Sequence, residues 1–378
     1  MLIRNARVFT VDGFRRGSIR TCGEVISELG DGLDESQGEK VVDAGGAYAI
    51  PGLVDLHLHG ALGRDFCEGS DEAIRMIAGF ERREGVAAFL CATMAQSIST
   101  LESMCEVSGA YEDPEKEGAD FLGVNMEAPF ISVQKRGAQN AAYVIPPDAD
   151  LFEHLQSCAR GRVRIVGVAP EVDGSKQLVE RASASARVSI AHTMANYEQA
   201  KAAFGQGARH VTHLFNAMPP LLHRAPGVVG AAWERDDVTA ELICDGNFVE
   251  PTVVRMALQL FGTSRIAMIS DGMPSSGLPD GTYVLGGDPI VVADGVGRVE
   301  RDGALAGPAT SLMGVMRAAV RRCGIPLEAA VTCASTTPAR ILGEGDRYGS
   351  LEAGHLADVV LLDDDLRTVM VLFRGREV

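Results

Sequence analysis

Short runs of apolar and β-branched residues alternate, through the middle of the chain, with longer runs whose apolar residues recur at helical spacing. Gly, Pro or Asp usually separates the two kinds of run, which is typical of βα units in a parallel sheet. Eight such strands favour an α/β fold with a closed (β/α)8 TIM-like barrel, and an open doubly wound sheet is the alternative. The candidate strands begin at Leu53, Val86, Phe121, Val163, Val188, His210, Thr239 and Ile266.

Amphipathic stretches lie between or directly after these strands, where a βα barrel places its helices. Several of them open on Asp, Asn or Pro, residues suited to a helix start. The predicted helices are 71–84, 196–204, 251–261 and 309–322.

The two ends of the chain differ from its middle. Residues 2–49 and 351–378 contain short strand-like runs broken by Gly and Asp, with little helical periodicity. Each end alone is too short to bury a core, and a barrel brings its chain ends near one another. We therefore expect residues 1–50 and 345–378 to form one small β-sandwich domain beside a barrel of residues 51–344.

Composition and charge exclude several classes of protein. The 378 residues include 35 basic and 51 acidic ones, a net charge of -16, without a basic block that would suit nucleic acid. Charges stand where a secretion signal would need an apolar run, and no later stretch is long and apolar enough to span a membrane. Eight cysteines without paired spacing suggest reduced, mostly buried thiols. These features predict a cytoplasmic protein with no nucleic-acid or membrane partner.

His57 and His59 lie two residues apart on the first candidate barrel strand, so their side chains point to the same face. At the carboxyl end of a barrel strand, such inward-pointing residues are where enzymes of this fold place their active sites. On this pair alone, metal binding and a plain structural role in the core stay equally open.

Further polar residues fall where other candidate strands end. Each could be a satisfied buried polar group on its own. Their recurrence at one rim of a barrel favours a divalent-metal site, with donors suited to zinc or iron. These residues are Glu127, His192, His213 and Asp271.

Several segments carry motifs of a known family. They are HLH at 57–59, MEAP at 126–129, HLFNAMP at 213–219, RAPG at 224–227, ICDG at 243–246, SDG at 270–272 and GSLEAGHLAD at 349–358. Together they resemble the N-acetylglucosamine-6-phosphate deacetylase family of the amidohydrolase superfamily. The resemblance runs across nearly the whole chain, and HLFNAMP with the RxPG that follows it is specific to that family.

The resemblance implies a set of metal ligands. Glu127, His192 and His213 match the protein ligands of a metal that is always present. His57 and His59 match a pair that, where it is His-x-His, helps to hold a second metal. The implied cofactor is one or two divalent ions per subunit, zinc first, with iron or manganese as alternatives.

A substrate site is implied by the same resemblance. Asp271 matches the catalytic carboxylate, and Asn216 and Ala217 match positions that contact the sugar phosphate. Arg224 matches an arginine that reaches the phosphate in a neighbouring subunit, which implies a homodimer. His223, next to it, is a further candidate for a cation near the phosphate.

Two positions depart from the family. Gln139 replaces a His found in some members, and its amide can hydrogen-bond substrate but cannot titrate. Phe248 stands where the family usually has a His that helps to bind phosphate, so a donor for a charge-assisted hydrogen bond is lost. Simple packing and an altered substrate preference explain Phe248 about equally well.

The function that the resemblance implies is metal-dependent hydrolysis of the acetamido group of N-acetyl-D-glucosamine 6-phosphate, which yields D-glucosamine 6-phosphate and acetate. The alternatives are deacetylation of a different amino sugar, another reaction of the superfamily, or non-catalytic binding on the same scaffold. Residues 163–171 contain no Lys for the carbamylated bridge of some other superfamily members, which favours the deacetylase. All the matched ligands are present, which argues against a binding protein.

Three other histidines have plainer interpretations. His154, on a predicted helix, and His355, in a turn, are expected at the surface. His210 begins the strand that carries His213, at an odd offset from it, so its side chain is expected to point to the opposite face.

Overall fold

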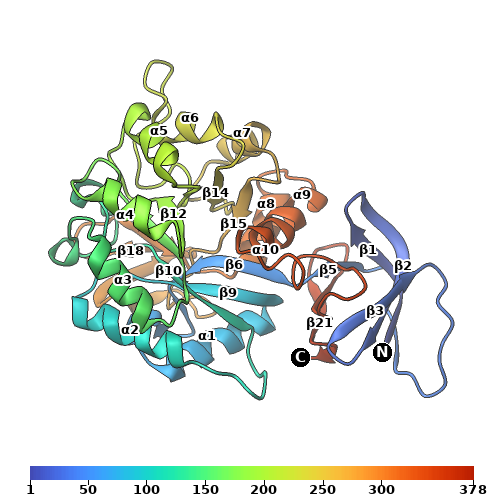
Figure 1. Ribbon diagram of the computed structural model, residues 1–378. Coiled ribbons are helices and arrows are strands. Elements are labelled where there is room, and N and C mark those ends of the chain that lie inside the picture. The colour runs from blue at the N-terminus through green and yellow to red at the C-terminus, as the bar shows by residue number, and fades with distance from the viewer.

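Eight parallel strands of the computed structural model, which describes residues 1–378, form the predicted barrel (Figure 1). Each strand is hydrogen-bonded to its neighbour in chain order. The circle closes where Asp271 N–H donates to His57 O (2.9 Å) and His59 N–H donates to Gly272 O (2.7 Å). The (β/α)8 barrel is confirmed, and the open sheet is excluded. The strands are β6 (Leu53–Leu58), β9 (Val86–Ala92), β10 (Asp120–Met126), β11 (Val163–Val168), β12 (Arg187–Ile190), β13 (His210–Val211), β14 (Thr239–Leu242) and β15 (Ile266–Met268).

The barrel strands are buried on both faces, as parallel strands flanked by helices must be. Every residue of β6 and of β9 is buried. A large apolar cluster fills the space between strands and helices. A smaller one, which includes Val54, Ile165 and Ala267, joins strands across the barrel and fills its lower interior. The predicted strand starts agree with the structure to within one residue, because these runs are continuously apolar.

Helices surround the barrel, and the predicted ones at 71–84, 196–204, 251–261 and 309–322 are confirmed with ends shifted by at most three residues. Side chains begin several of them: Ser70 accepts a hydrogen bond from Ala73 N–H, and Asn196 with Gln199 forms a capping box. The helices are α1 (Asp71–Arg83), α2 (Ile98–Ala110), α3 (Ala149–Cys158), α4 (Ser175–Ala182), α5 (Tyr197–Gln206), α6 (Gly227–Trp233), α7 (Pro251–Phe261), α8 (Leu312–Arg321), α9 (Leu327–Val331) and α10 (Thr337–Ile341).

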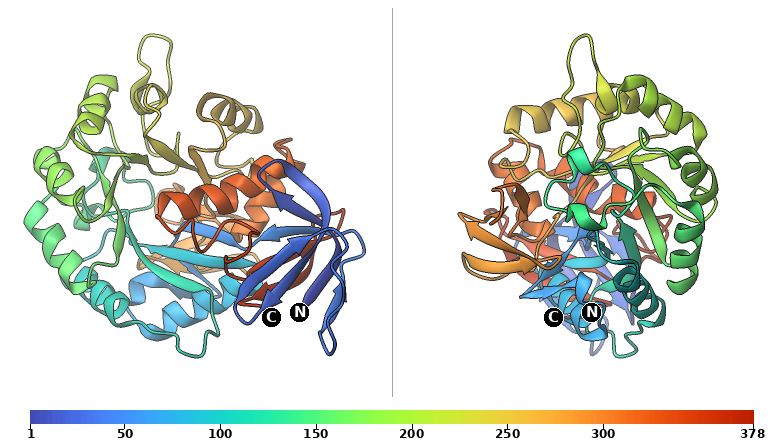
Figure 2. Two further views of the ribbon diagram at one scale, coloured as in Figure 1. Left: turned by 45° about the vertical axis from the view of Figure 1, so that its right-hand side comes forward. Right: turned by 90° about the vertical axis from the view of Figure 1, so that its left-hand side faces the viewer.

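Strands from both chain ends form a second sheet of eight strands. Its hydrogen-bonded path branches at β1, which pairs with β2 along one edge and with β4 and then β5 along the other, so the expected β-sandwich is built from one sheet. Figure 2 shows the two termini side by side in both views. Domain boundaries after residues 50 and 344 stay a prediction. The strands are β1 (Leu2–Thr10), β2 (Gly13–Cys22), β3 (Val25–Gly30), β4 (Val41–Asp43), β5 (Tyr48–Pro51), β20 (Val359–Leu362), β21 (Thr368–Phe373) and β22 (Arg376–Glu377).

Two small sheets were not expected from the sequence. One pairs β7 (Gly60–Ala61) with β8 (Arg64–Asp65). The other is a four-stranded antiparallel sheet between β15 and α8, whose first two turns are Gly286-Gly287 and Asp294-Gly295. Two-residue Gly-Gly and Asp-Gly loops are strong hairpin signals, so this sheet could have been predicted. Its strands are β16 (Gly281–Leu285), β17 (Asp288–Ala293), β18 (Val296–Val299) and β19 (Leu305–Pro308).

The cysteines form no disulfide bonds. All eight are free, and five of them are buried. None of the helices combines the length and apolar character needed to cross a membrane.

Candidate metal centre

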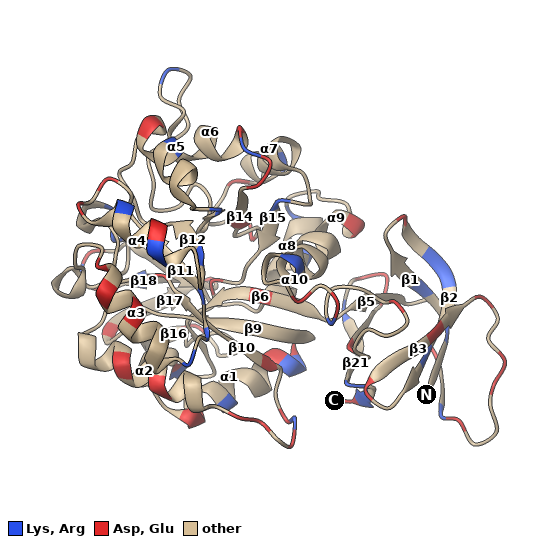
Figure 3. Cartoon of the chain, in the orientation of Figure 1, with Lys and Arg blue, Asp and Glu red and all other residues tan.

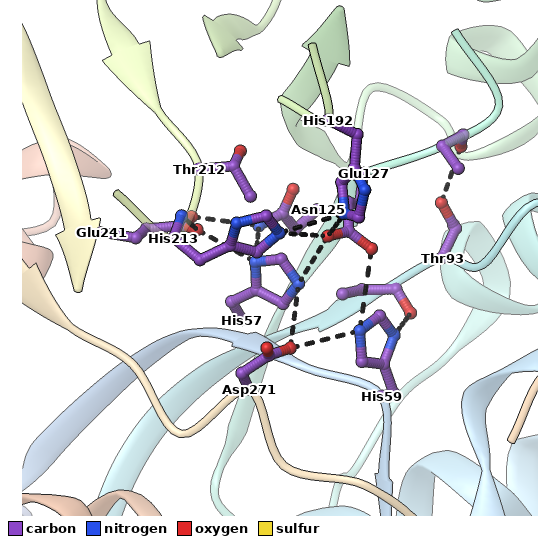
Figure 4. A network of polar contacts seen from close by, with 12 residues as sticks. His57, His59, Thr93, Asn125, Glu127, His192, Thr212, His213, Glu241 and Asp271 are labelled. Atoms are coloured by element: carbon purple, nitrogen blue, oxygen red, sulfur yellow. Dashed lines mark hydrogen bonds and ion pairs between the residues drawn. The ribbon is translucent and has the colours of Figure 1, made fainter. Parts of the chain in front are cut away.

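The six predicted ligand and catalytic residues lie together at the carboxyl rim of the barrel (Figure 4). Five different strands, β6, β10, β12, β13 and β15, bring them there, because parallel strands in a barrel all end at the same rim. All six are buried, and they form two groups whose possible ligand atoms lie within 4.8 Å of one another. The groups are Glu127, His192 and His213, and His57, His59 and Asp271.

The Glu127 group is the tighter of the two. Glu127 Oε1 lies 2.9 Å from His192 Nε2 and 2.9 Å from His213 Nε2. The two imidazole nitrogens are themselves only 3.1 Å apart. Three ligand atoms thus converge on one point, as at a three-ligand metal site.

The second group lies against the same carboxylate. Asp271 Oδ1 is 3.5 Å from His57 Nε2 and 3.4 Å from His59 Nε2. Glu127 Oε1 is 3.6 Å from His57 Nε2, while its Oε2 is 3.7 Å from His59 Nε2. Glu127 therefore stands between the two groups and is placed to serve both.

Hydrogen bonds on the far side of three imidazoles determine which nitrogen carries the proton. His192 Nδ1 lies 2.7 Å from Lys135 O, and His59 Nδ1 lies 3.2 Å from Ala92 O. His57 Nδ1 lies 3.0 Å from Glu241 Oε2. Carbonyl and carboxylate oxygens only accept, so Nδ1 donates in each case and Nε2 presents a lone pair to the centre.

These lone pairs face carboxylate oxygens with no donor between them. His57 Nε2 is buried without any hydrogen-bond partner. Such an arrangement is repulsive unless a positive charge lies at the centre, and imidazole nitrogen with carboxylate oxygen is a donor set for zinc, iron or manganese. The residues therefore fit a divalent metal, and we conclude that the chain uses one.

The electrostatics of the site agree with this fit. Burial opposes the charged form of His57, but the carboxylates of Glu241 and Glu127 outweigh it and raise the pKa of His57 to about 10. Burial would also raise the pKa of Glu127, but His192 and His57 hold it well below its ordinary value. Without a cation, His57 therefore holds a second proton on Nε2. A bound cation would supply the positive charge in place of that proton and leave Nε2 free as a lone pair.

A buried polar layer beneath the centre was missed in the sequence. Glu241, on β14, accepts hydrogen bonds from His57 Nδ1, from Asn125 Nδ2 (3.3 Å) and from His213 N–H (3.2 Å). Carboxylates that hold metal-ligating histidines in this way set their orientation and tautomer. A charged residue in the middle of an apolar strand run was the available signal for Glu241.

The expectation for His210 is wrong. Its side chain points into the same polar layer, is fully buried, and places Nε2 3.3 Å from Glu241 Oε1. The alternation rule fails because β13 ends at Val211 and the chain turns before His213. His154 is exposed and His355 half-buried, and neither belongs to the centre.

Three of the six site residues have a backbone conformation that residues other than glycine rarely adopt. The φ angles are 41° at His192, 27° at His213 and 48° at Asp271, all in the left-handed region. Each residue follows the end of a barrel strand within three positions. Strain of this kind persists where the surrounding structure holds a side chain in place for function.

A cavity of about 300 Å³ opens above the centre. Four of the five predicted substrate-binding residues line it: Gln139, Asn216, Ala217 and Phe248. Gln139 is already engaged, because its Nε2 donates to Glu127 Oε2 (2.6 Å) and its Oε1 accepts from Ala95 N–H (2.6 Å). It therefore holds Glu127 in position and also forms part of the cavity wall.

Arg224 is the exception, because it does not line this cavity of its own chain. It lies exposed on the loop between α5 and α6 that stands out at the top of Figure 1, with its Nη1 2.6 Å from His223 Nε2.

Two further parts of the cavity wall were missed in the sequence. Ala304, Leu305 and Ala306 bring the unexpected four-stranded sheet to its edge. Lys135 is the only Lys or Arg on the wall, and its Nζ donates to Met218 O (3.3 Å), next to Asn216 and Ala217.

Comparison with known proteins agrees with the site. The chain matches the amidohydrolase family over residues 48–378. It is 32% identical over 330 residues to the N-acetylglucosamine-6-phosphate deacetylase of Bacillus subtilis, which covers 86% of this chain and 83% of that protein. It is also 32% identical over 377 residues to the N-acetylgalactosamine-6-phosphate deacetylase of Escherichia coli O157:H7, covering 99% and 98% of the two chains.

Solved structures similar to this chain also include N-acetylglucosamine-6-phosphate deacetylases. The N-acetyl-D-glucosamine-6-phosphate deacetylase of Mycobacterium smegmatis superposes with a TM-score of 0.92 at 32% identity, over 100% of both chains. A variant of that enzyme in complex with N-acetyl-D-glucosamine-6-phosphate superposes equally well, covering 100% of this chain and 98% of that one. The chain therefore belongs to the amidohydrolase superfamily and, within it, to the N-acetylglucosamine-6-phosphate deacetylase family.

Proposed function

We propose that the protein hydrolyses the acetamido group of N-acetyl-D-glucosamine 6-phosphate to D-glucosamine 6-phosphate and acetate. The observation that carries the proposal is the convergence of four imidazoles and two carboxylates at one end of the barrel, where all of them except His57 line one cavity. Relatives named for this reaction match along most of the chain, which supports the choice of substrate.

We propose zinc as the metal, held by Glu127, His192 and His213, with His57 and His59 helping to hold a second ion. A divalent ion held by these residues would supply Lewis-acid chemistry, which polarises an acetamido carbonyl and makes a water molecule more acidic. The tautomers set by Lys135 O, Ala92 O and Glu241 keep the Nε2 atoms ready to bind it.

Asp271 is assigned the proton transfers. Burial would raise its pKa, but the nearby imidazoles of His59 and His57 lower it, so the carboxylate is ionised at neutral pH. It can therefore take a proton from the attacking water. The same carboxyl then protonates the departing nitrogen, which is needed because an amide anion is a poor leaving group.

The substrate phosphate is assigned to the outer part of the cavity. Asn216 and Ala217 lie on the wall there, and the ammonium group of Lys135 next to them suits an anionic group. Phe248 faces the same cavity and also contacts the apolar cluster inside the barrel, so its ring contributes to packing as well.

We propose a homodimer in which Arg224 serves the neighbouring site. Its loop carries two exposed leucines, Leu221 (40% exposed) and Leu222 (53% exposed), whose burial against a second copy would favour association. The eight free cysteines suit a reducing compartment, which supports a cytoplasmic location.

A second candidate substrate is N-acetyl-D-galactosamine 6-phosphate. A relative named for that substrate matches over nearly the whole length of both chains. Phe248, in place of the usual phosphate-binding His, is the residue that leaves the preference between the two sugars open.

Acetate release tests the proposal. The enzyme is assayed on N-acetylated hexosamines of both epimers, each with and without the 6-phosphate, while bound metal is measured in the same preparation. We expect turnover of the glucosamine epimer with phosphate, one or two ions per chain, and strongly reduced turnover in Asp271→Asn. Equal release from the free sugars, or turnover in a preparation stripped of metal, would contradict it.

A further inference from the structure

A second cavity, of about 470 Å³, opens at the opposite rim of the barrel, where strands β11, β12 and β13 begin. Four arginines line it, three of them on different elements and one in the loop before β13, and not one Asp or Glu is among the lining residues. The whole protein carries a net charge of -16, and Figure 3 shows acidic segments along the outer helices α1 to α4. The arginines are Arg164, Arg187, Arg209 and Arg340.

Two of these arginines have carboxylate partners outside the cavity wall. Arg164 Nη2 lies 3.3 Å from Glu344 Oε1, and Arg209 Nε lies 3.0 Å from Asp237 Oδ2. The other two have none. Arg340 donates to a backbone carbonyl, Ser264 O, at 2.6 Å. Its charge is therefore not neutralised, since a carbonyl carries no net charge.

Arg187 is the least satisfied of the four. It is half-buried at the first position of β12, and its guanidinium has neither a hydrogen bond nor an ion pair within the chain. Burial and the neighbouring charge of Arg209 both lower its pKa, and no nearby carboxylate opposes them. Partly buried charges in proteins are normally paired, so a partner from outside the chain is expected.

We propose that this arginine cavity is a binding site for a phosphate group, free or carried by a small molecule. Planar guanidinium groups match phosphate oxygens with paired hydrogen bonds, and Ser185 lies on the same wall. The cavity has room for more than the phosphate itself, which admits a sugar phosphate. This site is separate from the metal centre and does not depend on the proposed function.

The strands that carry the arginines also carry the metal ligands. Arg187 begins β12, which leads to His192, and Arg209 precedes β13, which leads to His213. Both strands are short, so an anion that draws their first residues together stabilises the elements that hold the metal centre. Binding should therefore raise the unfolding temperature, as any ligand specific to the folded state does.

Calorimetric titration of the metal-loaded enzyme with inorganic phosphate tests the proposal, with glucosamine 6-phosphate and acetate as further arms. The variants are Arg187→Gln and Arg340→Gln in the arginine cavity, Lys135→Gln in the catalytic cavity, and Arg83→Gln on the exposed surface of α1 as a charge-matched control. We expect Arg187→Gln and Arg340→Gln each to weaken one phosphate-binding event about tenfold or more, the worth of a hydrogen bond to a charged group. Neither should alter the KM of the proposed substrate, and Arg83→Gln should behave as the wild type.

The arms of this experiment also separate the sources of the phosphate. Tighter binding of glucosamine 6-phosphate than of inorganic phosphate at this site identifies a sugar phosphate, and the reverse identifies the free ion. The proposal is overturned if acetate binds as tightly as phosphate, or if only Lys135→Gln changes the titration. It is also overturned if crystals soaked in tungstate show no anion beside Arg187, a readout that holds even where one variant fails to fold.

Discussion

The two rims of the barrel are opposites in charge and in hydrogen bonding. At the carboxyl rim, four imidazoles and two carboxylates converge with acceptors in excess, and the missing partner is a cation. At the amino rim, four arginines converge with donors in excess, and the missing partner is an anion. The same short strands, β12 and β13, contribute to both rims. Groups that lack a partner of opposite character thus indicate the sign of the ligand to be tested at each rim, although the two rims share the same strands.

The largest expected effect comes from removing a ligand at the carboxyl rim. His213→Ala deletes one of the three proposed ligands Glu127, His192 and His213, and a three-ligand site cannot spare one. We expect the tightly bound metal to be lost and acetate release to fall to the level of chelator-treated wild type. Phosphate binding at the arginine cavity should be unchanged. Full metal content by elemental analysis would remove His213 from the ligand set, and His192→Ala provides an independent check.

Asp271→Asn separates proton transfer from metal binding at the same rim. The amide keeps the size of the side chain but cannot shuttle a proton, so turnover should fall by about 10²- to 10⁴-fold, the usual contribution of a general acid and base. The ion held by Glu127, His192 and His213 should stay in place. Steady-state kinetics with metal analysis measure both quantities. Turnover near that of the wild type would show that another group moves the proton.

Glu241→Gln tests the layer that lies between the two rims. Glu241 does not line the cavity above the centre, yet it holds His57 in the tautomer that faces the centre. Loss of such a supporting carboxylate typically weakens metal affinity about 10- to 100-fold. We expect this loss for the more weakly held ion in competition with a chelator. Glu81→Gln, which changes an equally buried carboxyl of α1, is the control, and identical titrations for both variants would contradict the positioning role.

The smallest expected effect concerns Phe248. Phe248→His adds a hydrogen-bond donor to the cavity wall. It should therefore strengthen the binding of phosphorylated substrate about tenfold, or by about 1.4 kcal/mol. The KM of N-acetylglucosamine without phosphate serves as the internal control, and Lys135→Gln should shift the same ratio in the opposite direction. A ratio unchanged in Phe248→His would mean that the ring only packs.

Sequence patterns predicted the residues of the carboxyl rim far better than the polar layer beneath them or the arginines of the amino rim. His192, His213 and Asp271 could be found because strand ends are local signals, and parallel strands in a barrel deliver all their ends to one place. Glu241 and His57 are 184 positions apart in the sequence, and they come into contact only because the barrel closes. The arginines at strand starts were overlooked because an isolated Arg at a strand end is ordinary at a surface. Only the cavity shows that four of them share one space.

One pairing in the second sheet has a consequence for how the protein is made. Val359 of β20 pairs with Pro51 of β5, and β5 leads directly into the strand that carries His57. Those two positions are 359 − 51 = 308 residues apart, so synthesis at about 5–20 residues per second separates them by roughly 15–60 s. During that interval the edge of β5 has no partner, although a hairpin forms in about 1–10 μs. The newly made chain therefore carries an unpaired strand edge while synthesis continues. Unpaired edges favour misassembly, so this is the interval in which a chaperone would protect the chain most.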